Sequence, residues 1–410
     1  MSVSKKRWLV LLFACLTNLC LGSVYAWSVF AAPMAEYLGN VTGTAITTAD
    51  LAIVYTVANS VGPITMISGG WINDRFGPKT VILTGGIMFG GGMILSGMAS
   101  SVGMLMVTYG LLGGLGLGMA YGCTISSCVK FFPDKRGLIG GLTTAAYGFS
   151  SVLLPPVVNV LVEKFEVKMA FVIVGVVFLV IISVSSRFIF FCPEGFVPDG
   201  WKAPEKQAAK GAEVNKNWKE MLKSPIFYLM ILLLMSGAFS GMMIISQASA
   251  VGMEMIGLSV ASAGIAVSVL ALFNSFGRIL AGLLSDKIGR VQTLTLACVL
   301  SVAGNMLLYF CGEGDLLLFY TGISVVGICF GAFMGVFPGF TADQFGAAHN
   351  SVNYGIMFIG FAMAGYFGPT IMKTVYYKTG VYTQAFLIAA ALSIAGILLT
   401  ILYRICNKKK

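Results

Sequence analysis

Between two long apolar segments the chain reads Gly70-Trp71-Ile72-Asn73-Asp74-Arg75-Phe76-Gly77-Pro78-Lys79. A second copy of this pattern reads Gly282-Leu283-Leu284-Ser285-Asp286-Lys287-Ile288-Gly289-Arg290. Both copies have a glycine, then an aspartate followed by Arg or Lys, then a second glycine and another cation just beyond. A single copy would fit any charged turn between two helices, but two copies in register predict a chain built from duplicated halves.

The segments around these copies have the composition of a membrane protein. Of the 410 residues 57% are hydrophobic and 10% are charged, whereas soluble domains are about 25% charged. About 20 apolar residues in helical form cross a hydrocarbon core of about 30 Å, and backbone groups in lipid must bond internally. The sequence therefore predicts twelve transmembrane helices, at residues 8–32, 48–72, 79–99, 102–131, 137–163, 168–192, 225–253, 258–285, 291–312, 315–342, 350–377 and 382–404.

The predicted fold is an all-α membrane protein with two pseudo-symmetric six-helix halves. Residues 1–192 form the N-terminal half and residues 225–410 the C-terminal half. The polar segment 193–224 is predicted to be a cytoplasmic linker. Membrane folds with repeated halves of the same topology have their substrate site between the halves.

The two repeated turns are predicted to form a conformational latch. Glycine at the start of each copy allows close helix packing, and each aspartate can meet a helix N-terminus and a neighbouring cation. The predicted latch residues are Gly70, Asp74 and Arg75 in the first half and Gly282, Asp286 and Lys287 in the second.

The net charge of +10 is explained by topology. With the N-terminus inside, the predicted inner segments carry 20 Lys and Arg residues and the outer loops carry four. The positive-inside rule then predicts a multi-pass protein of the cell (plasma or inner) membrane with both termini cytoplasmic. No nucleic-acid partner is expected.

The only histidine, His349, lies in a predicted loop, so we expect no metal site, no cofactor and no enzymatic nucleophile–base pair.

Arg278 is the ionisable residue predicted to lie deepest in the bilayer. It precedes Asp286, at the predicted interface, by about two helical turns, which places it about 12 Å into the membrane. Asn274, one turn earlier, can only form hydrogen bonds. A guanidinium at this depth must face water or an anionic ligand, and its fork suits a carboxylate. A structural role, bonding carbonyls at a helix end, is the alternative.

Aromatic residues on other predicted helices lie at a similar depth. Each alone fits a core or lipid-facing position. Gathered around Arg278 they would form a small, dry cage for a compact anion. These residues are Tyr25, Trp27, Tyr121, Tyr147, Phe330 and Phe333.

The paired turns resemble the signature loop of the major facilitator superfamily, and this resemblance covers the whole chain. Leu21-Gly22-Ser23-Val24-Tyr25-Ala26-Trp27 and the segment 131–141 resemble signatures of monocarboxylate transporters. The chain is still more similar to the oxalate:formate antiporter family, in Phe131-Phe132-Pro133-Asp134-Lys135-Arg136-Gly137, Leu272-Phe273-Asn274 followed by Arg278, and Asn353-Tyr354-Gly355. This resemblance implies that Arg278 binds the substrate carboxylate and that Tyr25, Trp27, Tyr121 and Tyr147 contribute to the cage.

The sequence departs from the antiporter pattern at Phe361, where oxalate carriers have a lysine for the second carboxylate. The expected substrate is therefore a monoanion such as lactate, pyruvate or formate, and exchange of oxalate is the alternative. Monocarboxylate transporters have an aspartate at the position of Asn274. Coupling therefore stays open between anion exchange or uniport and symport in which a proton binds together with the substrate.

Two other functions fit the same fold less well. A drug or cation exporter would require an acidic residue in the cavity, and the deep charge here is positive. A non-transporting anion sensor would require a signalling domain, for which the linker and tails leave no room. We expect a monomer whose partners are a small organic anion and membrane lipid, with a co-transported proton or counter-anion as a further candidate partner.

Overall fold

The computed structural model describes residues 3–201 and 215–408. It divides into two compact units. The first unit comprises Met1–Asp134, Ala146–Asn215 and Gly346–Ile356, and the second comprises Lys135–Ala145, Lys216–Phe345 and Met357–Lys410. Two short segments, 135–145 and 346–356, are thus grouped with helices that are distant in sequence. The predicted division into 1–192, 193–224 and 225–410 stays a prediction.

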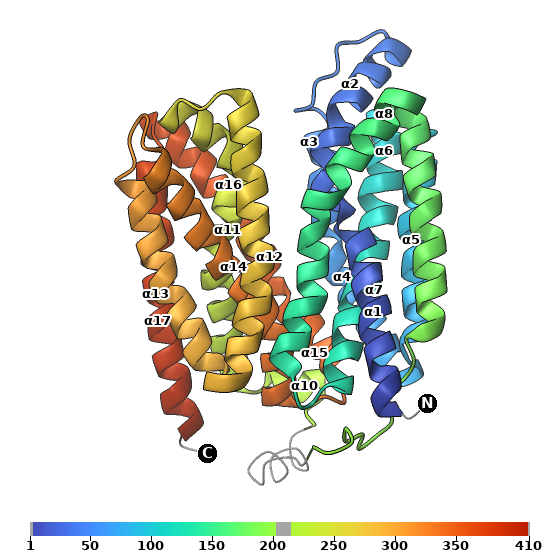
Figure 1. Ribbon diagram of the computed structural model, residues 1–410, viewed down its shortest axis with the longest axis vertical. Helices are drawn as coiled ribbons and strands as arrows, with labels where there is room; N and C mark the ends of the chain where they lie inside the picture. The colour runs from blue at the N-terminus through green and yellow to red at the C-terminus, as the bar shows by residue number, and fades with distance from the viewer. Residues whose placement is uncertain (1–2, 202–214, 409–410) are drawn as a thin grey trace. The chain divides into compact units, whose positions relative to one another are not determined.

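The first unit contains the helices of the first part of the chain, which run alongside one another (Figure 1). Within it, α5 and α4 both pack against α7. These elements are α1 (Val3–Leu21), η1 (Gly22–Ala26), α2 (Trp27–Thr42), α3 (Ala52–Ser60), α4 (Gly62–Phe76), α5 (Pro78–Ser96), α6 (Val102–Leu105), η2 (Met106–Gly113), α7 (Gly114–Phe131) and most of α8 (Arg136–Phe188).

The second unit is a further bundle of long helices (Figure 1). In it α14 packs against α12 and α13, and α11 packs against α16. Its elements are α10 (Trp218–Leu222), α11 (Pro225–Ile256), α12 (Val260–Ile288), α13 (Arg290–Tyr309), α14 (Leu316–Phe345), α16 (Ile359–Thr379) and α17 (Thr383–Lys408). The short helix α15 (Asn350–Met357) belongs almost wholly to the first unit.

Ten helical segments of the described residues are long and apolar enough to cross a membrane. One of them, α8, has 53 residues and is broken at Glu166, whose φ of 63° is not helical, so it supplies two of the predicted spans. The predicted span 48–72 falls on α3 and α4, which are separate short helices. The observed helices are consistent with the twelve predicted ones, and the predicted all-α fold is confirmed.

Two transmembrane helices contain a stretch that is not α-helical. Residues Gly22–Ala26 form a 3₁₀ turn between α1 and α2, inside the predicted first span. Residues Met106–Gly113 form a π-helical stretch before α7. Such departures within helices are frequent at functional sites, and the sequence analysis predicted neither of them.

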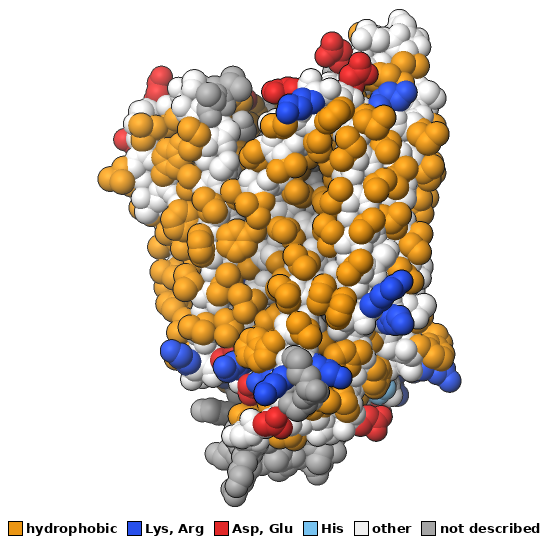
Figure 2. Space-filling view, turned by 45° about the vertical axis from the view of Figure 1, so that its right-hand side comes forward, with side chains coloured by type: hydrophobic (Ala, Val, Ile, Leu, Met, Phe, Trp, Pro, Cys, Tyr) orange, Lys and Arg blue, Asp and Glu red, His pale blue; other side chains and the backbone are white. Residues whose placement is uncertain are grey.

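The surface of the helices is hydrophobic. On the face drawn in Figure 2, hydrophobic side chains cover most of the length of the helices. Large apolar side chains such as Leu280, Leu398 and Ile64 are more than half exposed. Apolar surface of this extent on a folded chain requires an apolar environment, and the predicted contact with lipid supplies it.

Part of the predicted linker can be described. Residues 202–214 lie outside the described residues. After them, Asn217 caps α10, because its side chain accepts hydrogen bonds from the backbone N–H groups of Lys219 and Glu220. The Glu220 side chain in turn accepts the Asn217 N–H at 2.8 Å, which completes a capping box.

Candidate functional site

Arg278 lies on α12 and is one of the largest fully buried side chains, with 1% of its surface exposed. Its Nε donates to the Asn274 side-chain oxygen at 3.2 Å, and its Nη1 donates to the Thr144 carbonyl oxygen at 2.7 Å. Both acceptors are neutral, and no carboxylate of the described residues forms an ion pair with this guanidinium. The site therefore holds a buried positive charge that is hydrogen-bonded but not neutralised.

Glycines hold the Arg278 backbone in place. A Cβ atom on Gly331 of α14 would collide with the Asn274 carbonyl oxygen and lie 2.9 Å from the Arg278 nitrogen. Gly335 of α14 and Gly141 of α8 likewise approach the Arg278 carbonyl oxygen too closely for a side chain. Three backbones therefore meet at this residue, because the sequence has glycine at each contact.

Phenylalanines of the same unit lie on α14 and α16. Phe330 of α14 is fully buried and packs over Gly241 of α11. Its ring lies 6.2 Å from that of Phe361, which stacks on Phe358 at 4.4 Å. The position where oxalate carriers have a lysine is thus occupied by an aromatic cluster.

The predicted tyrosines come together in the first unit. The Tyr147 ring lies 5.2 Å from that of Tyr25 and 4.9 Å from that of Tyr121. Trp27 contacts a different residue, Tyr109, with ring centroids 4.7 Å apart. Tyr109 is 2% exposed and its hydroxyl has no hydrogen-bond partner among the described residues, so it is a further candidate that the sequence analysis did not name.

Asp286 bonds to the start of α8. Its carboxylate accepts the backbone N–H groups of Gly137 at 2.9 Å and Leu138 at 2.8 Å. It also pairs with Arg290 at 2.7 Å. A Cβ atom on Gly282 would collide with the Gly137 carbonyl oxygen, so glycine at this position is what allows α12 to reach the first turn of α8.

Asp74 has the corresponding contacts in the first unit. Its two carboxylate oxygens accept the backbone N–H groups of Ser351 at 3.3 Å and Val352 at 3.1 Å, in the first turn of α15. Its ion-pair partner is Lys130 of α7, at 2.6 Å. A Cβ atom on Gly70 would lie 2.7 Å from the Ser351 backbone, so the two repeated turns make the same kind of contact.

The cations of the two turns are not those that pair with the aspartates. Arg75 is exposed, and its guanidinium lies 5.5 Å from the centroid of the Trp71 ring. Lys287 is also exposed. The pairing cations are Lys130 of α7 and Arg290, the first residue of α13, which follows Asp286 by four residues. Sequence spacing signalled Arg290 as the cation just beyond the repeat, whereas nothing in the spacing signalled Lys130.

Comparisons with known proteins agree with this architecture. The family model described as Major Facilitator Superfamily matches residues 11–310 and 245–410. The chain is 30% identical to the uncharacterized MFS-type transporter YhjX of Escherichia coli (strain K12), over 88% of this chain and 86% of that protein. It is also 30% identical to the oxalate:formate antiporter of Oxalobacter formigenes, over 94% of this chain and 89% of that protein.

More distant similarity points the same way. The human monocarboxylate transporter 12 is 24% identical, over 83% of this chain and 70% of that protein. The crystal structure of the human organic anion transporter MFSD10 (TETRAN) has the same fold, with a TM-score of 0.75 over 96% of this chain and 99% of that one, at 13% identity. With the family model matched along nearly all of its length, the chain belongs to the major facilitator superfamily of membrane transporters.

Proposed function

We propose that this transporter carries small organic anions, most readily monocarboxylates such as lactate, pyruvate or formate, by alternating access, with Arg278 binding the substrate carboxylate. The observation that carries the proposal is the burial of Arg278 without an acidic partner in the part of the chain that the structure describes.

The energetics of a buried guanidinium support this role. Removing a charge from water costs several kcal/mol even after relaxation, and only an opposite charge with good hydrogen bonds offsets that cost. Asn274 and the Thr144 carbonyl satisfy hydrogen bonds but supply no negative charge. A substrate carboxylate would supply it, and the planar fork of arginine allows two parallel hydrogen bonds.

The predicted structural role of Arg278, bonding a helix carbonyl, is compatible with substrate binding. The bond to Thr144 uses Nη1 alone, and a second terminal nitrogen belongs to the same guanidinium. In this proposal the carboxylate binds at that nitrogen and competes with the Thr144 carbonyl for Nη1. Asn274 orients the guanidinium through Nε.

The charge of the substrate follows from Phe361. A dicarboxylate would place two negative charges against one arginine, and the aromatic contacts of Phe361 with Phe330 and Phe358 offer no cation. A monocarboxylate matches the single charge. Exchange of oxalate for formate is the second candidate, and the 30% identity to an oxalate:formate antiporter is the observation that favours it.

Coupling and the aromatic contacts stay predictions. Asn274 is an amide and does not bind and release a proton as a carboxylate does, so exchange, uniport and symport of a substrate together with its proton are all consistent with the site. Tyr25, Trp27, Tyr121 and Tyr147 stay predicted substrate contacts, to be tested as single Tyr→Phe or Trp→Phe variants. The monomeric state and the cytoplasmic location of both termini are likewise predictions.

The test is uptake of labelled lactate, pyruvate, formate and oxalate into proteoliposomes. We expect a monocarboxylate to accumulate and Arg278→Gln to abolish its uptake. Arg187→Gln is the matched control, because Arg187 is exposed and lies near the end of α8. Normal transport by folded Arg278→Gln, or loss of uptake in both variants alike, would contradict the assignment. A preference for oxalate would contradict the argument from Phe361.

A further inference from the structure

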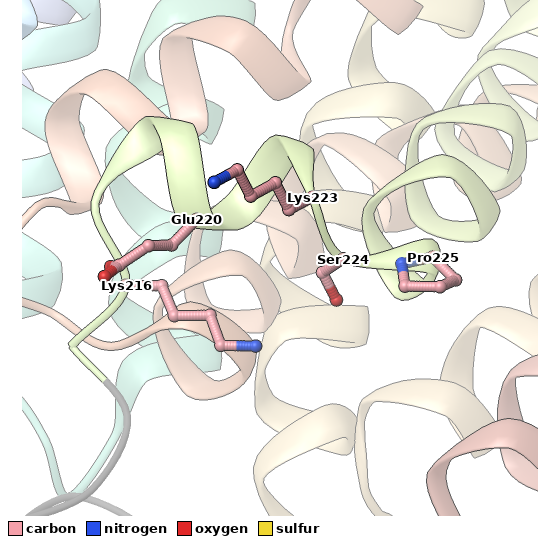
Figure 3. Close-up of a pocket in the computed structure, with 5 residues that line it drawn as sticks. All are labelled: Lys216, Glu220, Lys223, Ser224 and Pro225. Atoms are coloured by element: carbon pink, nitrogen blue, oxygen red, sulfur yellow. The ribbon is translucent and has the colours of Figure 1, made fainter.

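A pocket of about 310 Å³ lies where α10 leads into the transmembrane helix α11. Its lining consists of Lys216, Glu220, Lys223, Ser224 and Pro225 (Figure 3). None of these residues belongs to the candidate anion site at Arg278. In Figure 3 the Lys216 side chain extends in the direction of Ser224, while the side chains of Glu220 and Lys223 extend from α10.

The Ser224 side chain has an unsatisfied hydrogen-bonding group in this pocket. Ser224 is 6% exposed, and its hydroxyl has no hydrogen-bond partner among the described residues. It occupies the N-cap position of α11, where a serine hydroxyl ordinarily accepts a first-turn N–H, yet it makes no such bond. A buried hydroxyl without a partner is costly, and this one lies beside the positive end of a 32-residue helix.

The described lining of the pocket suits an anion. Lys216 and Lys223 are positively charged, and the Glu220 carboxylate already accepts the Asn217 N–H. An anion such as a phosphodiester, which carries a single negative charge, can bind to these groups. Lysine ammonium, a serine hydroxyl and a helix N-terminus are the groups that bind phosphate oxygens in proteins.

The pocket is anchored to the bundle and lies directly before α11, a helix long and apolar enough to cross a membrane. The Lys216 N–H donates to the Phe345 carbonyl oxygen at 2.9 Å, at the end of α14, and Met221 of α10 is fully buried. Trp218 on α10 is 40% exposed, and the Lys219 ammonium lies 5.4 Å from its ring centroid. Exposed tryptophan beside lysine, directly before an apolar span, is typical of the membrane–water interface.

We propose that this pocket binds the phosphodiester headgroup of an anionic phospholipid. Lys216, Lys223 and the Ser224 hydroxyl hold the phosphate at the start of α11, and Trp218 lies beside the acyl chains. The bound lipid fixes the segment that connects α10 to the first transmembrane helix of the second unit. This site is independent of the substrate proposed for Arg278.

Native mass spectrometry of the delipidated full chain in detergent tests the proposal, with phosphatidylglycerol, phosphatidylcholine and inorganic phosphate as probes. We expect phosphatidylglycerol to bind and the double variant Lys216→Gln/Lys223→Gln to bind it at least about tenfold more weakly, since each lysine supplies a charge-assisted hydrogen bond. The double variant Lys5→Gln/Lys6→Gln removes the same charge from exposed lysines outside the pocket and should bind within about twofold of the unmodified protein.

Ser224→Ala provides a second readout that deletes a single oxygen. We expect it to weaken phosphatidylglycerol binding several-fold without lowering the melting temperature. Equal binding by the pocket variants and the control variants would overturn the proposal. So would inorganic phosphate competing as well as the lipid, because the site would then take a free anion. Both readouts are independent of transport, so they separate this proposal from the function proposed above.

Discussion

The hydrogen bonds between Asp286 and the first turn of α8 can be tested directly with Asp286→Asn. The carboxylate accepts two backbone N–H groups, at 2.9 and 2.8 Å, and pairs with Arg290. Asparagine keeps one acceptor oxygen but loses the charge and the second acceptor. Arg290 keeps its bond to Asp343, at 2.9 Å, so no buried cation is left without an acid.

The magnitude follows from these contacts. A hydrogen bond to a charged group contributes about 1.5–3 kcal/mol, and because Arg290 stays paired the larger cost of an orphaned charge does not arise. We therefore expect the first turns of α8 to open more easily by about 2 kcal/mol, which corresponds to roughly 30-fold. Hydrogen-exchange mass spectrometry of the peptide that covers residues 137–145 measures this opening as faster exchange.

The repeat provides the matched control. Asp74→Asn should accelerate exchange in residues 350–356 and leave residues 137–145 unchanged, because Asp74 bonds to Ser351 and Val352. Its effect should be at least as large, since Lys130 then loses its acid partner. If either variant accelerated both segments equally, or if neither changed its own segment, the aspartates would not hold these helix ends.

Three further predictions follow from packing, charge and burial. Gly331→Ala inserts a Cβ into the α12 backbone and should cost about 1–3 kcal/mol, measured as a lower melting temperature; Gly264→Ala on α12, which has open space, should not destabilise. Phe361→Lys supplies a second cation, so competition assays should show a shift in preference from monocarboxylates toward oxalate; an unchanged preference would refute the charge argument. Cys311 is buried, so at neutral pH its maleimide labelling should be slow and the exposed Cys406 should label first; equal rates would contradict this.

The sequence predicted the fold because lipid imposes a simple rule. Long apolar segments must be helices, and the repeated turns mark where the helices end. Hydropathy does not reveal breaks that keep the composition apolar. The 3₁₀ turn at Gly22–Ala26 and the π-helical stretch at Met106–Gly113 are as apolar as their neighbours, so they could not be predicted.

The part of the candidate site that could be predicted from the sequence is the part that depends on a single residue type. Arg278 stands out because a charge is costly at its depth. Its acceptor at Thr144 is a backbone carbonyl, which every residue carries, so no sequence pattern identifies it. Lys130 pairs with Asp74 across helices, and a contact of that kind depends on tertiary packing. The ion pair between Asp286 and Arg290 joins residues four positions apart, so both of its members could be identified in the repeated sequence pattern.

The repeat also bears on the number of charges that face a substrate. The alignment that matches Asp74 with Asp286 matches Met66 with Arg278. Met66 is 2% exposed, and a Cβ atom on Gly355 of α15 would lie 3.0 Å from its backbone. The equivalent position of the first half thus carries a buried apolar side chain in place of a charge. The two repeated turns make similar contacts, whereas of the two matched positions only Arg278 carries a charge, which agrees with the singly charged substrate proposed above.

One side of α12 connects the proposed substrate site to the predicted latch at Asp286. Arg278, Gly282 and Asp286 are spaced by four residues, so they lie along one side of the helix. All three contact the first turns of α8. Arg278 donates to the Thr144 carbonyl, Gly282 packs against the Gly137 backbone, and Asp286 accepts the Gly137 and Leu138 N–H groups. A carboxylate that takes Nη1 of Arg278 removes one of these contacts. Saturating substrate should therefore speed hydrogen exchange in residues 137–145 of the unmodified protein, whereas in Arg278→Gln it should have no effect. If substrate slowed exchange in that segment, binding would strengthen the contact between α12 and α8, and competition for the guanidinium could not be what couples the site to the latch.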